Sequence, residues 1–499
     1  MISILKGALT HNFISWRFYM FQPECYPVAK AGGLGDVVGA LPKYQTAAGH
    51  IAKVVMPMYK TKFLYNNEFD VVHKGYTNLG NWWFIYTVIK ERNNTLGFDL
   101  YLIDINGLLD RDKIYGYDDD SERFISFQIA TVDWLASWKH HPDVVHVHDH
   151  QAALIPFMIK HCYRYQHLRD IPTVLTIHNA EYQGWLSWDK SYYIPAWDTW
   201  KTGLLEWNKS INALACGVRC AWKVTTVSWS YLEELRWAAN GLEALFEYER
   251  GKCFGILNGI DTKVWDPVTD TYLENHYDIK SNAAGKTKNK EILCKRFGLD
   301  IEKPLIAFIG RLVGEKGADL LPQAIGDSFY YIGRKMNFLI LGSGASYIQD
   351  SLERVSVLSD GDFSIFIGYD EALSHIIYAG ADFIMMPSRV EPCGLNQMYA
   401  MRYGTVPIVR ATGGLKDTVK DFGDPDGYGI RFGNAIVGDI THAVWRAVQL
   451  YQEPLLMEEL RRRMMRLDFS WKPVCNNIWI FTLRYNEKLI NQTLCQKKY

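Results

Sequence analysis

The sequence lacks paired cysteine motifs and long apolar runs. Its nine cysteines form no CxxC pair and no Cys/His spacing typical of zinc, so we expect no metal site. Reduced thiols are typical of the cytosol, and we expect a cytoplasmic protein, with a plastid as the alternative location. No apolar run reaches the roughly 18 residues that a membrane span requires, so we expect no membrane partner. Residues 1–17 contain Lys6, His11 and Arg17 and no small-residue cleavage pattern, and we interpret them as an unassigned extension rather than a signal peptide.

An excess of charge is absent too. The 54 Lys and Arg residues nearly balance the 55 Asp and Glu residues, and no long basic run occurs, so nucleic acid is an unfavourable partner. What is present is length and apolar content: 499 residues, 48% of them hydrophobic, predict two domains of roughly 200–250 residues. The aromatic content of 14% suits carbohydrate stacking, although large cores also contain many aromatic residues.

Short apolar, β-branched runs alternate with segments of helical length, a pattern typical of parallel sheets covered on both faces. The runs are IAKVVMP (51–57), VVHVHD (144–149), TVLTIHN (173–179), KVTTVS (223–228), PLIAFIG (304–310), FLILGSG (338–344), FSIFIGY (363–369) and FIMMPS (383–388). RFYMFQ (17–22) is expected to form the first strand, although it is less apolar than the others. WWFIYTVIKE and FDLYLID, on either side of RNNTLG at 92–97, predict an antiparallel hairpin.

These patterns predict an α/β protein with two doubly wound, Rossmann-like domains that face each other across a cleft. The polar stretch from Glu274 to Lys290 has no strand signal, and it separates GILNGID (255–261) from the next apolar run. We therefore expect an N-terminal domain over 1–262, a C-terminal domain over 263–470 and a helical segment over 471–499.

A glycine loop, KAGGLGDVVGALP, occupies residues 30–42. Gly32, Gly33 and Gly35 follow the first predicted strand and precede a helical segment, where backbone N–H groups and the helix dipole favour a phosphate. Lys30 adds a positive charge. A tight strand–helix turn also requires glycine, so the loop alone leaves both interpretations open.

Arg311 and Lys316 follow another apolar run, at the sheet edge where ligands bind in such folds. Strand-end charges are often merely solvated. Fixed cations here would, however, stabilise a departing nucleoside diphosphate as its glycosidic bond breaks.

Glu391 follows FIMMPSR and precedes a segment that should begin a helix. A carboxylate near a diphosphate site is favourable when it faces the sugar, where it stabilises an oxocarbenium-like transition state. The alternative is a Glu that only caps the helix. Cys393 has no adjacent His partner, so we interpret it as a small loop residue rather than a nucleophile.

Tyr369 ends another apolar run, where it suits either stacking on a base or a core position. His146, His148 and His150 alternate along one predicted strand and should project to the same side. Without a convergent carboxylate or cysteine pattern, we do not interpret them as a metal site.

Together these segments resemble the bacterial-type glycogen synthases and the plant starch synthases, from about residue 18 onward. The matching segments are ECYPVAKAGGLGDVVGALPK, YGYDDDSERF, PDVVHVHDHQAAL, TIHNAEYQG, KVTTVS, GILNGIDTKVWDP, IGRLVGEKG, GYDEALSHIIYAGADF and SRVEPCGLNQMYAMRYGT with TGGLKDTV. The resemblance implies a retaining GT-B glucosyltransferase that adds glucose from ADP-glucose to the non-reducing end of an α-1,4-glucan, without cofactor or metal. It also implies that the chain returns to the first domain after Trp471.

The resemblance assigns site residues by position in these segments. Glu391 matches the family's essential carboxylate, and Arg311 and Lys316 hold the diphosphate. The implied donor site comprises Lys30, Gly32, Gly33, Asp36, Tyr369, Cys393, Gly394, Leu395, Gly413 and Gly414. The implied glucose and acceptor side comprises Asp119, Gln151, Asn179 and Asn258.

The chain departs from the family pattern at several positions. Gln151 stands where many relatives have histidine, Ala215 where many have lysine, Trp229 where proline is usual, and Val390 where an aromatic residue is usual. The departures at Gln151 and Ala215 motivate one alternative, a glucan-binding or regulatory homologue with weak or no turnover. A second alternative keeps the fold but changes the reaction, as in a GT-B transferase that uses a UDP-sugar.

Overall fold

The computed structural model describes residues 15–474, which form two compact units. Unit 1 comprises the described residues up to 225 together with 238–254, and unit 2 comprises 226–237 and the described residues from 255. The chain thus passes into unit 2 a few residues before the boundary expected near 262. Of the segment 471–499, only residues 471–474 are described, so its expected return to the first domain lies outside the described residues.

Unit 1 is built on a nine-stranded sheet in the order β12-β11-β7-β6-β1-β2-β5-β4-β3. The pairs β1/β2, β1/β6 and β6/β7 are parallel, as the continuous apolar runs predict. The pair β2/β5 is parallel too, although the β5 segment was expected only in an antiparallel hairpin. The strands are β1 Arg17–Phe21, β2 Ile51–Pro57, β3 Phe69–Leu79, β4 Trp82–Glu91, β5 Asp99–Asp104, β6 Val144–His148, β7 Thr173–Ile177, β11 Lys223–Thr226 and β12 Cys253–Gly255.

The antiparallel hairpin of β4 and β5 is confirmed, and a further strand, β3, pairs with the other edge of β4. Asp70, His73, Lys74 and Gly75 interrupt the apolar pattern of β3, which explains why the sequence does not reveal it. The ring of Tyr86 on β4 fills the space beside Gly75, so that no side chain fits there.

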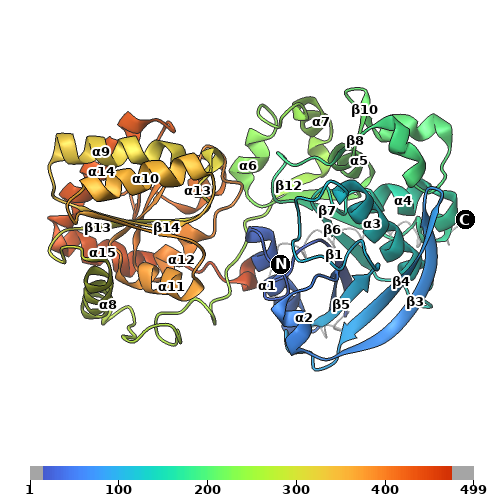
Figure 1. The fold of residues 1–499 in the computed structure, drawn as a ribbon, viewed down its shortest axis with the longest axis horizontal. Helices are drawn as coiled ribbons and strands as arrows, with labels where there is room; N and C mark the ends of the chain where they lie inside the picture. Colours follow the sequence, from blue (N-terminus) through green and yellow to red (C-terminus); the bar gives the residue numbers. More distant parts are fainter. Residues whose placement is uncertain (1–14, 475–499) are drawn as a thin grey trace, which may run out of the picture. The chain divides into compact units, whose positions relative to one another are not determined.

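Short helices and a small second sheet complete unit 1 (Figure 1). The small sheet has the order β8-β10-β9, with β8 Trp185–Leu186, β9 Glu206–Trp207 and β10 Ser210–Asn212. The helices are α1 Gly33–Ala47, α2 Lys62–Asn66, α3 Asp120–Ala136, α4 Ile155–His161, α5 Ala213–Cys220 and α7 Glu243–Tyr248.

Unit 2 is a parallel sheet in the order β15-β14-β13-β16-β17-β18, with helices on both faces (Figure 1). This is the doubly wound architecture that the alternation predicts. The strands are β13 Leu305–Ile309, β14 Asn337–Gly342, β15 Phe363–Ile367, β16 Phe383–Met386, β17 Val406–Arg410 and β18 Ile430–Phe432. The helices are α6 Trp229–Glu234, α8 Asn282–Phe297, α9 Leu321–Ile332, α10 Ser346–Leu358, α11 Glu371–Gly380, α12 Asn396–Arg402, α13 Gly413–Thr418, α14 Val437–Tyr451 and α15 Pro454–Met464.

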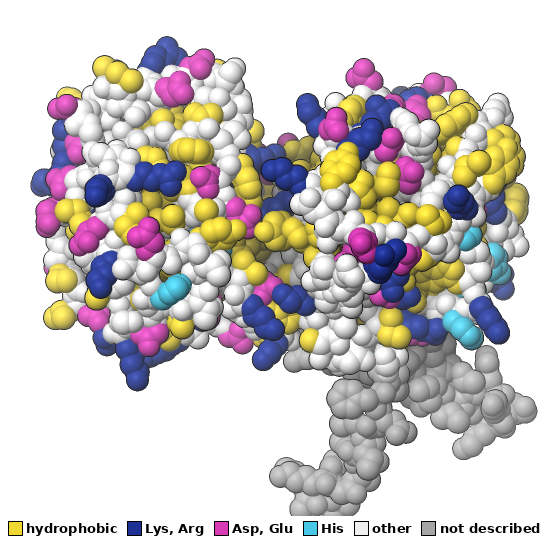
Figure 2. All heavy atoms as spheres, turned by 60° about the horizontal axis from the view of Figure 1, so that its bottom comes forward, with side chains coloured by type: hydrophobic (Ala, Val, Ile, Leu, Met, Phe, Trp, Pro, Cys, Tyr) yellow, Lys and Arg dark blue, Asp and Glu magenta, His cyan; other side chains and the backbone are white. Residues whose placement is uncertain are grey.

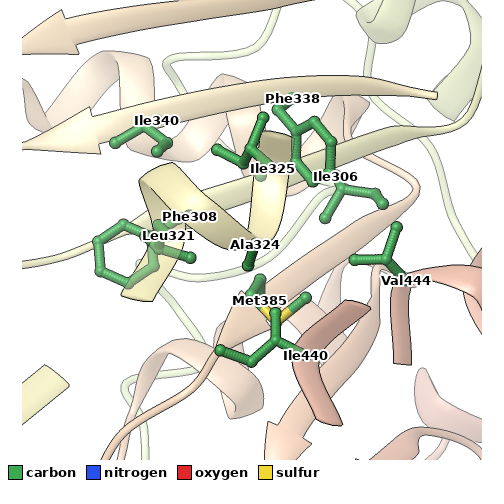
Figure 3. Close-up of a pocket in the computed structure, with 11 residues that line it drawn as sticks. Ile306, Phe308, Leu321, Ala324, Ile325, Phe338, Ile340, Met385, Ile440 and Val444 are labelled. Carbon is green, nitrogen blue, oxygen red and sulfur yellow. The ribbon is translucent and has the colours of Figure 1, made fainter. Parts of the chain in front are cut away.

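The core of unit 2 contains one small apolar cavity of about 10 Å³ (Figure 3). It lies between β13, β14 and β16 on one side and α9 and α14 on the other, and Phe308, Ile325, Met385 and Val444 are among its lining residues. A space of this size with apolar walls offers a water no hydrogen-bond partner, so we interpret it as a packing gap rather than a ligand site.

On the face shown in Figure 2, basic and acidic side chains are interspersed. The distribution on this face accords with the balanced composition of the chain. Within the part of the chain that the structure describes, no helix combines the length and apolarity needed to traverse a bilayer.

Candidate active site

In unit 2, the candidate residues lie just beyond the carboxyl ends of parallel strands. Arg311 and Lys316 follow β13, Glu391 follows β16, Tyr369 follows β15, and Gly413 follows β17. Ligands of doubly wound sheets bind at this edge. The sheet order β15-β14-β13-β16-β17 places the β13, β16 and β17 loops next to one another.

Lys316 and Glu391 form a close ion pair. The Lys316 ammonium lies 2.8 Å from each carboxylate oxygen of Glu391, and the Ser388 hydroxyl donates to one of them at 2.9 Å. Glu391 is only 6% exposed, so the ammonium compensates a carboxylate largely removed from water. The capping alternative for Glu391 is wrong, because α12 begins at Asn396 and has no side-chain cap.

The loop after β13 presents Lys316 through a turn that requires glycine. Gly317 has φ +66°, and a Cβ there would collide with the Pro387 carbonyl oxygen. Arg389 joins the same two loops, because its guanidinium donates to Asp319 at 2.6 and 2.9 Å. The positions of Lys316 and of the Glu391 segment are therefore fixed together.

Arg311 and Tyr369 lie near the surface of unit 2. The Arg311 guanidinium is 3.1 Å from the Glu315 carboxylate, and its side chain is about half exposed. Tyr369 is 74% exposed, and its hydroxyl donates to Glu371 at 3.4 Å. The core alternative for Tyr369 is therefore wrong, and its ring is accessible to a stacking partner.

The glycine turn before α13 packs directly on the Glu391 segment. The Gly413 amide donates to the Glu234 carboxylate at 2.8 Å, and the Gly414 amide donates to the Glu391 carbonyl oxygen at 3.0 Å. Both amides therefore have protein acceptors in this structure, and their contact with a donor stays a prediction. Glu234, on α6, was not singled out from the sequence, since no local pattern distinguishes it from an ordinary helix glutamate.

Cys393 is buried beneath the glycine turn and lies next to Gly414. Burial raises the pKa of the Cys393 thiol to about 12, and hydrogen bonds from Asn258 only partly oppose that shift. A buried, protonated thiol is a poor nucleophile, which agrees with a small loop residue. Gly394 has φ +72°, and Leu395 is the N-cap position of α12.

In unit 1, the glycine loop begins a helix as predicted. Gly32 is the N-cap of α1, and the Lys30 ammonium lies 2.7 Å from Asp36 in the first turn. The Glu24 carboxylate accepts the Ala31 and Gly32 amides at 2.7 and 3.0 Å. The Gly32 amide, one of those predicted to face a phosphate, is thus already bound by a carboxylate from the same unit.

Three of the four residues expected on the glucose and acceptor side lie in unit 1. Asp119 pairs with Arg111 at 2.8 Å, and the Asn179 side chain accepts the Glu181 amide at 3.0 Å. Gln151 is 8% exposed, and its side-chain oxygen has no hydrogen-bond partner among the described residues. Asn258, the fourth of this set, belongs to unit 2 and contacts Cys393.

The histidine pattern is only partly as predicted. The His146 and His148 rings lie 4.2 Å apart, but β6 ends at His148 and Asp149 has φ +53°, so His150 is not on the strand. A positive φ reverses the chain direction and breaks the alternation. Burial lowers the pKa of His146 to about 4 and that of His178, which contacts His148, to about 3. Across residues 15–474, no group of three or more His, Cys, Asp or Glu side chains is arranged to hold a metal ion.

The departures from the family pattern fall in different environments. Ala215 is fully buried in α5, where its amide donates to the N-cap Asn212 at 2.8 Å. Trp229 is 58% exposed in the first turn of α6. The exposed tryptophan therefore fills no gap in the core, whereas a lysine in place of Ala215 would bring a charge into buried surroundings.

Comparison with known proteins identifies two family models along the chain. Residues 17–248 match the starch synthase catalytic domain, and residues 289–451 match glycosyl transferases group 1. The glycogen synthase of Flavobacterium johnsoniae is 53% identical over 473 residues, which cover 95% of this chain and 100% of that protein. The glycogen synthase of Streptococcus pneumoniae is 36% identical and covers 91% of this chain and 96% of that protein.

Solved structures support the same relationship. The catalytic domain of starch synthase IV from Arabidopsis thaliana, bound to ADP and acarbose, has a TM-score of 0.86 and 31% identity, and it covers 94% of this chain and 99% of that chain. Sucrose-phosphate synthase from Thermosynechococcus elongatus has a TM-score of 0.61 at 16% identity, covers 95% of this chain and 100% of that chain, and shows the fold alone. With 53% identity over nearly its whole length and this fold, the chain belongs to the glycogen and starch synthase family, the retaining glucosyltransferases with the GT-B fold.

Proposed function

We propose that this protein transfers glucose from ADP-glucose to the non-reducing end of an α-1,4-glucan, with retention at the anomeric carbon. The Lys316–Glu391 pair at the edge of the parallel sheet carries the proposal. The relatives named glycogen synthase, and the related starch synthase structure that contains ADP and acarbose, support this donor and acceptor.

The pair suits a site where a diphosphate and a sugar meet. A carboxylate next to a diphosphate is repelled by it unless a cation separates them. Lys316 is such a cation, because an ammonium has three N–H donors and two of them are directed at Glu391. The third has the capacity to meet a diphosphate oxygen, with Glu391 on the far side, facing the sugar.

Breakage of the glycosidic bond increases the negative charge on the departing ADP. Lys316 and Arg311 would stabilise that charge more in the transition state than in the bound donor, which raises turnover. Glu391 would stabilise the positive charge that develops on the sugar ring. Lys30 and Asp36 are included in the proposed donor site, and Asp119, Gln151, Asn179 and Asn258 in the glucose and acceptor side.

No metal or cofactor takes part in the proposed reaction. We also propose a cytoplasmic location, which the free thiols of the described cysteines support, since the cytosol keeps thiols reduced.

The test is incorporation of radiolabelled glucose into glycogen by the purified protein, with ADP-glucose and UDP-glucose compared at equal concentrations. We expect incorporation from ADP-glucose, and a Glu391→Gln variant, which keeps the shape of the side chain, serves as the matched control. Faster transfer from UDP-glucose would instead favour the UDP-sugar alternative. No transfer from either donor, with glycogen still bound, would favour the glucan-binding alternative, for which the partnerless Gln151 oxygen at a usual histidine position is the motivating observation.

A further inference from the structure

Glu24 has a buried carboxylate, and both of its oxygens accept hydrogen bonds. It lies three residues beyond the end of β1 and is 4% exposed. One oxygen accepts the Ala31 and Gly32 amides, and the other accepts the Tyr115 hydroxyl at 2.7 Å. One side chain thus joins the glycine loop to the loop that contains Tyr115.

The two amides that Glu24 binds lie at the amino end of α1. Such amides have no partner within the helix, and a negative charge placed there is also favoured by the helix dipole. Glu24 therefore binds the amide of Gly32, one of the three glycines that the sequence suggested for a phosphate. The loop, in consequence, contributes Lys30 to the site rather than the Ala31 and Gly32 amides.

The packing around Lys30 depends on the same arrangement. A Cβ on Gly35 would lie 3.1 Å from Lys30 Cγ and 3.4 Å from a Glu24 carboxylate oxygen, so the Lys30 stem and Glu24 both pack against this glycine. Beyond the stem, the Lys30 ammonium meets Asp36 at 2.7 Å. The position of the ammonium is thus set by the loop that Glu24 holds.

On its other side, Glu24 reaches the segment that precedes α3. Tyr115 donates to Glu24, and Asp119 lies four positions further along the chain, at the N-cap of α3. Burial of Glu24 without these donors would leave an uncompensated carboxylate, so loss of either partner disturbs both loops.

We infer that Glu24 is a positioning residue that holds Lys30 and the Asp119 loop in place for the transfer reaction. The inference rests on the proposed function for its kinetic consequence. Glu24 acts through its hydrogen bonds and through Lys30, and it does not itself contact the donor.

The experiment measures kcat and KM for ADP-glucose in the full-length protein and its variants. For Glu24→Ala we expect kcat/KM to fall by about 10- to 100-fold, the cost of misplacing a binding group by about an ångström. Glu24→Gln should stay within about threefold of wild type, because the carboxamide oxygen still accepts both amides and its NH₂ group donates to the Tyr115 oxygen. Tyr115→Phe should lower kcat/KM by about three- to tenfold.

Glu91 provides a matched control in the same unit. It is 1% exposed, and its carboxylate accepts the Thr95 amide at 3.1 and 3.3 Å, in a different loop from the glycine loop and from the loop that contains Tyr115. Glu91→Ala should lower the thermal midpoint of unfolding as Glu24→Ala does, yet leave kcat/KM within about twofold of wild type.

Two further measurements distinguish a positioning role of Glu24 from a general loss of stability. In a double-mutant cycle, Glu24→Ala should lower kcat/KM less in the Lys30→Ala background than in wild type, because part of its effect passes through Lys30. Hydrogen exchange of the Ala31 and Gly32 amides should accelerate in Glu24→Ala but not in Glu91→Ala.

The inference is overturned if Glu24→Ala folds with wild-type kcat/KM, if Glu24→Gln is as impaired as Glu24→Ala, or if the effects of Glu24→Ala and Lys30→Ala multiply. If the wild-type protein transfers no glucose, the proposed function fails by itself. Hydrogen exchange then still tests the role of Glu24, since unchanged protection of Ala31 and Gly32 in Glu24→Ala contradicts it.

Discussion

The ammonium of Lys316 and the carboxylate of Glu391, 75 residues apart in sequence, meet at 2.8 Å through both carboxylate oxygens. The contact joins the loops after β13 and β16, which are neighbouring strands of the unit 2 sheet. Each side chain neutralises the other in a partly buried setting, so neither is a freely solvated surface charge.

Replacement of either member should abolish most of the activity. We expect Lys316→Ala and Glu391→Ala each to lower kcat by more than about 100-fold, because loss of one well-placed electrostatic contact costs on the order of 3–4 kcal/mol. Transfer from ADP-glucose to glycogen measures this. Near-wild-type turnover in either variant would remove that residue from the mechanism.

The same pair makes a separate prediction for stability. Lys316→Ala leaves the buried Glu391 carboxylate without its cation, and Glu391→Ala leaves a partly buried ammonium unpaired, whereas the double variant Lys316→Ala/Glu391→Ala removes both charges. In urea unfolding, the double variant should therefore lose less stability than the sum of the single variants, while its activity stays low. Strictly additive losses of stability would show that the two side chains do not interact in solution.

Two glycines in helices of unit 2 should respond to alanine in opposite directions. A Cβ on Gly414 would collide with the Cys393 backbone, so Gly414→Ala should destabilise the protein by about 2 kcal/mol or more and disturb the site. A Cβ on Gly438, in α14, meets no atom within 4 Å, so Gly438→Ala should stabilise it by up to about 1 kcal/mol. Thermal unfolding of both variants measures this difference. Equal shifts of the melting temperature in the two variants would contradict the close contact between Gly414 and the Cys393 backbone.

Acid should destabilise unit 1 through its buried histidines. Burial lowers the pKa of His50, His146 and His150 to about 4 and that of His178 to about 3. Above the unfolded pKa of about 6.5 their contribution is complete, and it is lost as pH falls toward the folded values, because the unfolded chain then binds more protons. Asp149 has the opposite sign: burial raises its pKa to about 7, so its contribution is lost as pH rises through 7.

The expected net result is a free energy of unfolding that is lower at pH 5 than at pH 7, as measured by urea titration. An Asp149→Asn variant should show a steeper fall over the same interval, since it loses the one opposing group named above. A flat profile in the wild-type protein would mean that these histidines are already protonated in the folded state.

Chelation should leave the reaction unchanged. Because the proposed chemistry rests on Lys316, Arg311 and Glu391, we expect full transfer activity after incubation with EDTA and removal of divalent cations. Loss of activity that returns with added Mg²⁺ or Mn²⁺ would contradict a metal-free mechanism.

Strands with continuous apolar runs could be predicted from the sequence, because a parallel strand buried on both faces needs such a run. Each predicted run forms a strand, from β1 in unit 1 to β16 in unit 2. The edge strand β3 could not be predicted, since its polar residues and Gly75 are compatible with a strand only when Tyr86 packs opposite.

In the site, too, residues could be identified from their own segments, whereas their contacts could not. Lys316 and Glu391 could be identified from the segments that contain them, but their contact depends on β13 and β16 lying side by side. Glu24 and Glu234 could not be identified from the sequence, because each accepts hydrogen bonds from backbone amides outside its own element. Glu24 binds an amide of the glycine loop and Glu234 binds the Gly413 amide, and no local sequence pattern reveals this acceptor role. His150 was placed on a strand because alternation alone does not show where a chain reverses at a positive φ.

The most direct measurement is a crystal structure of the protein with ADP. We expect diphosphate oxygens within about 3.5 Å of the Lys316 ammonium and the Arg311 guanidinium, at hydrogen-bonding distance. Ordered ADP whose diphosphate contacts neither side chain would contradict this expectation.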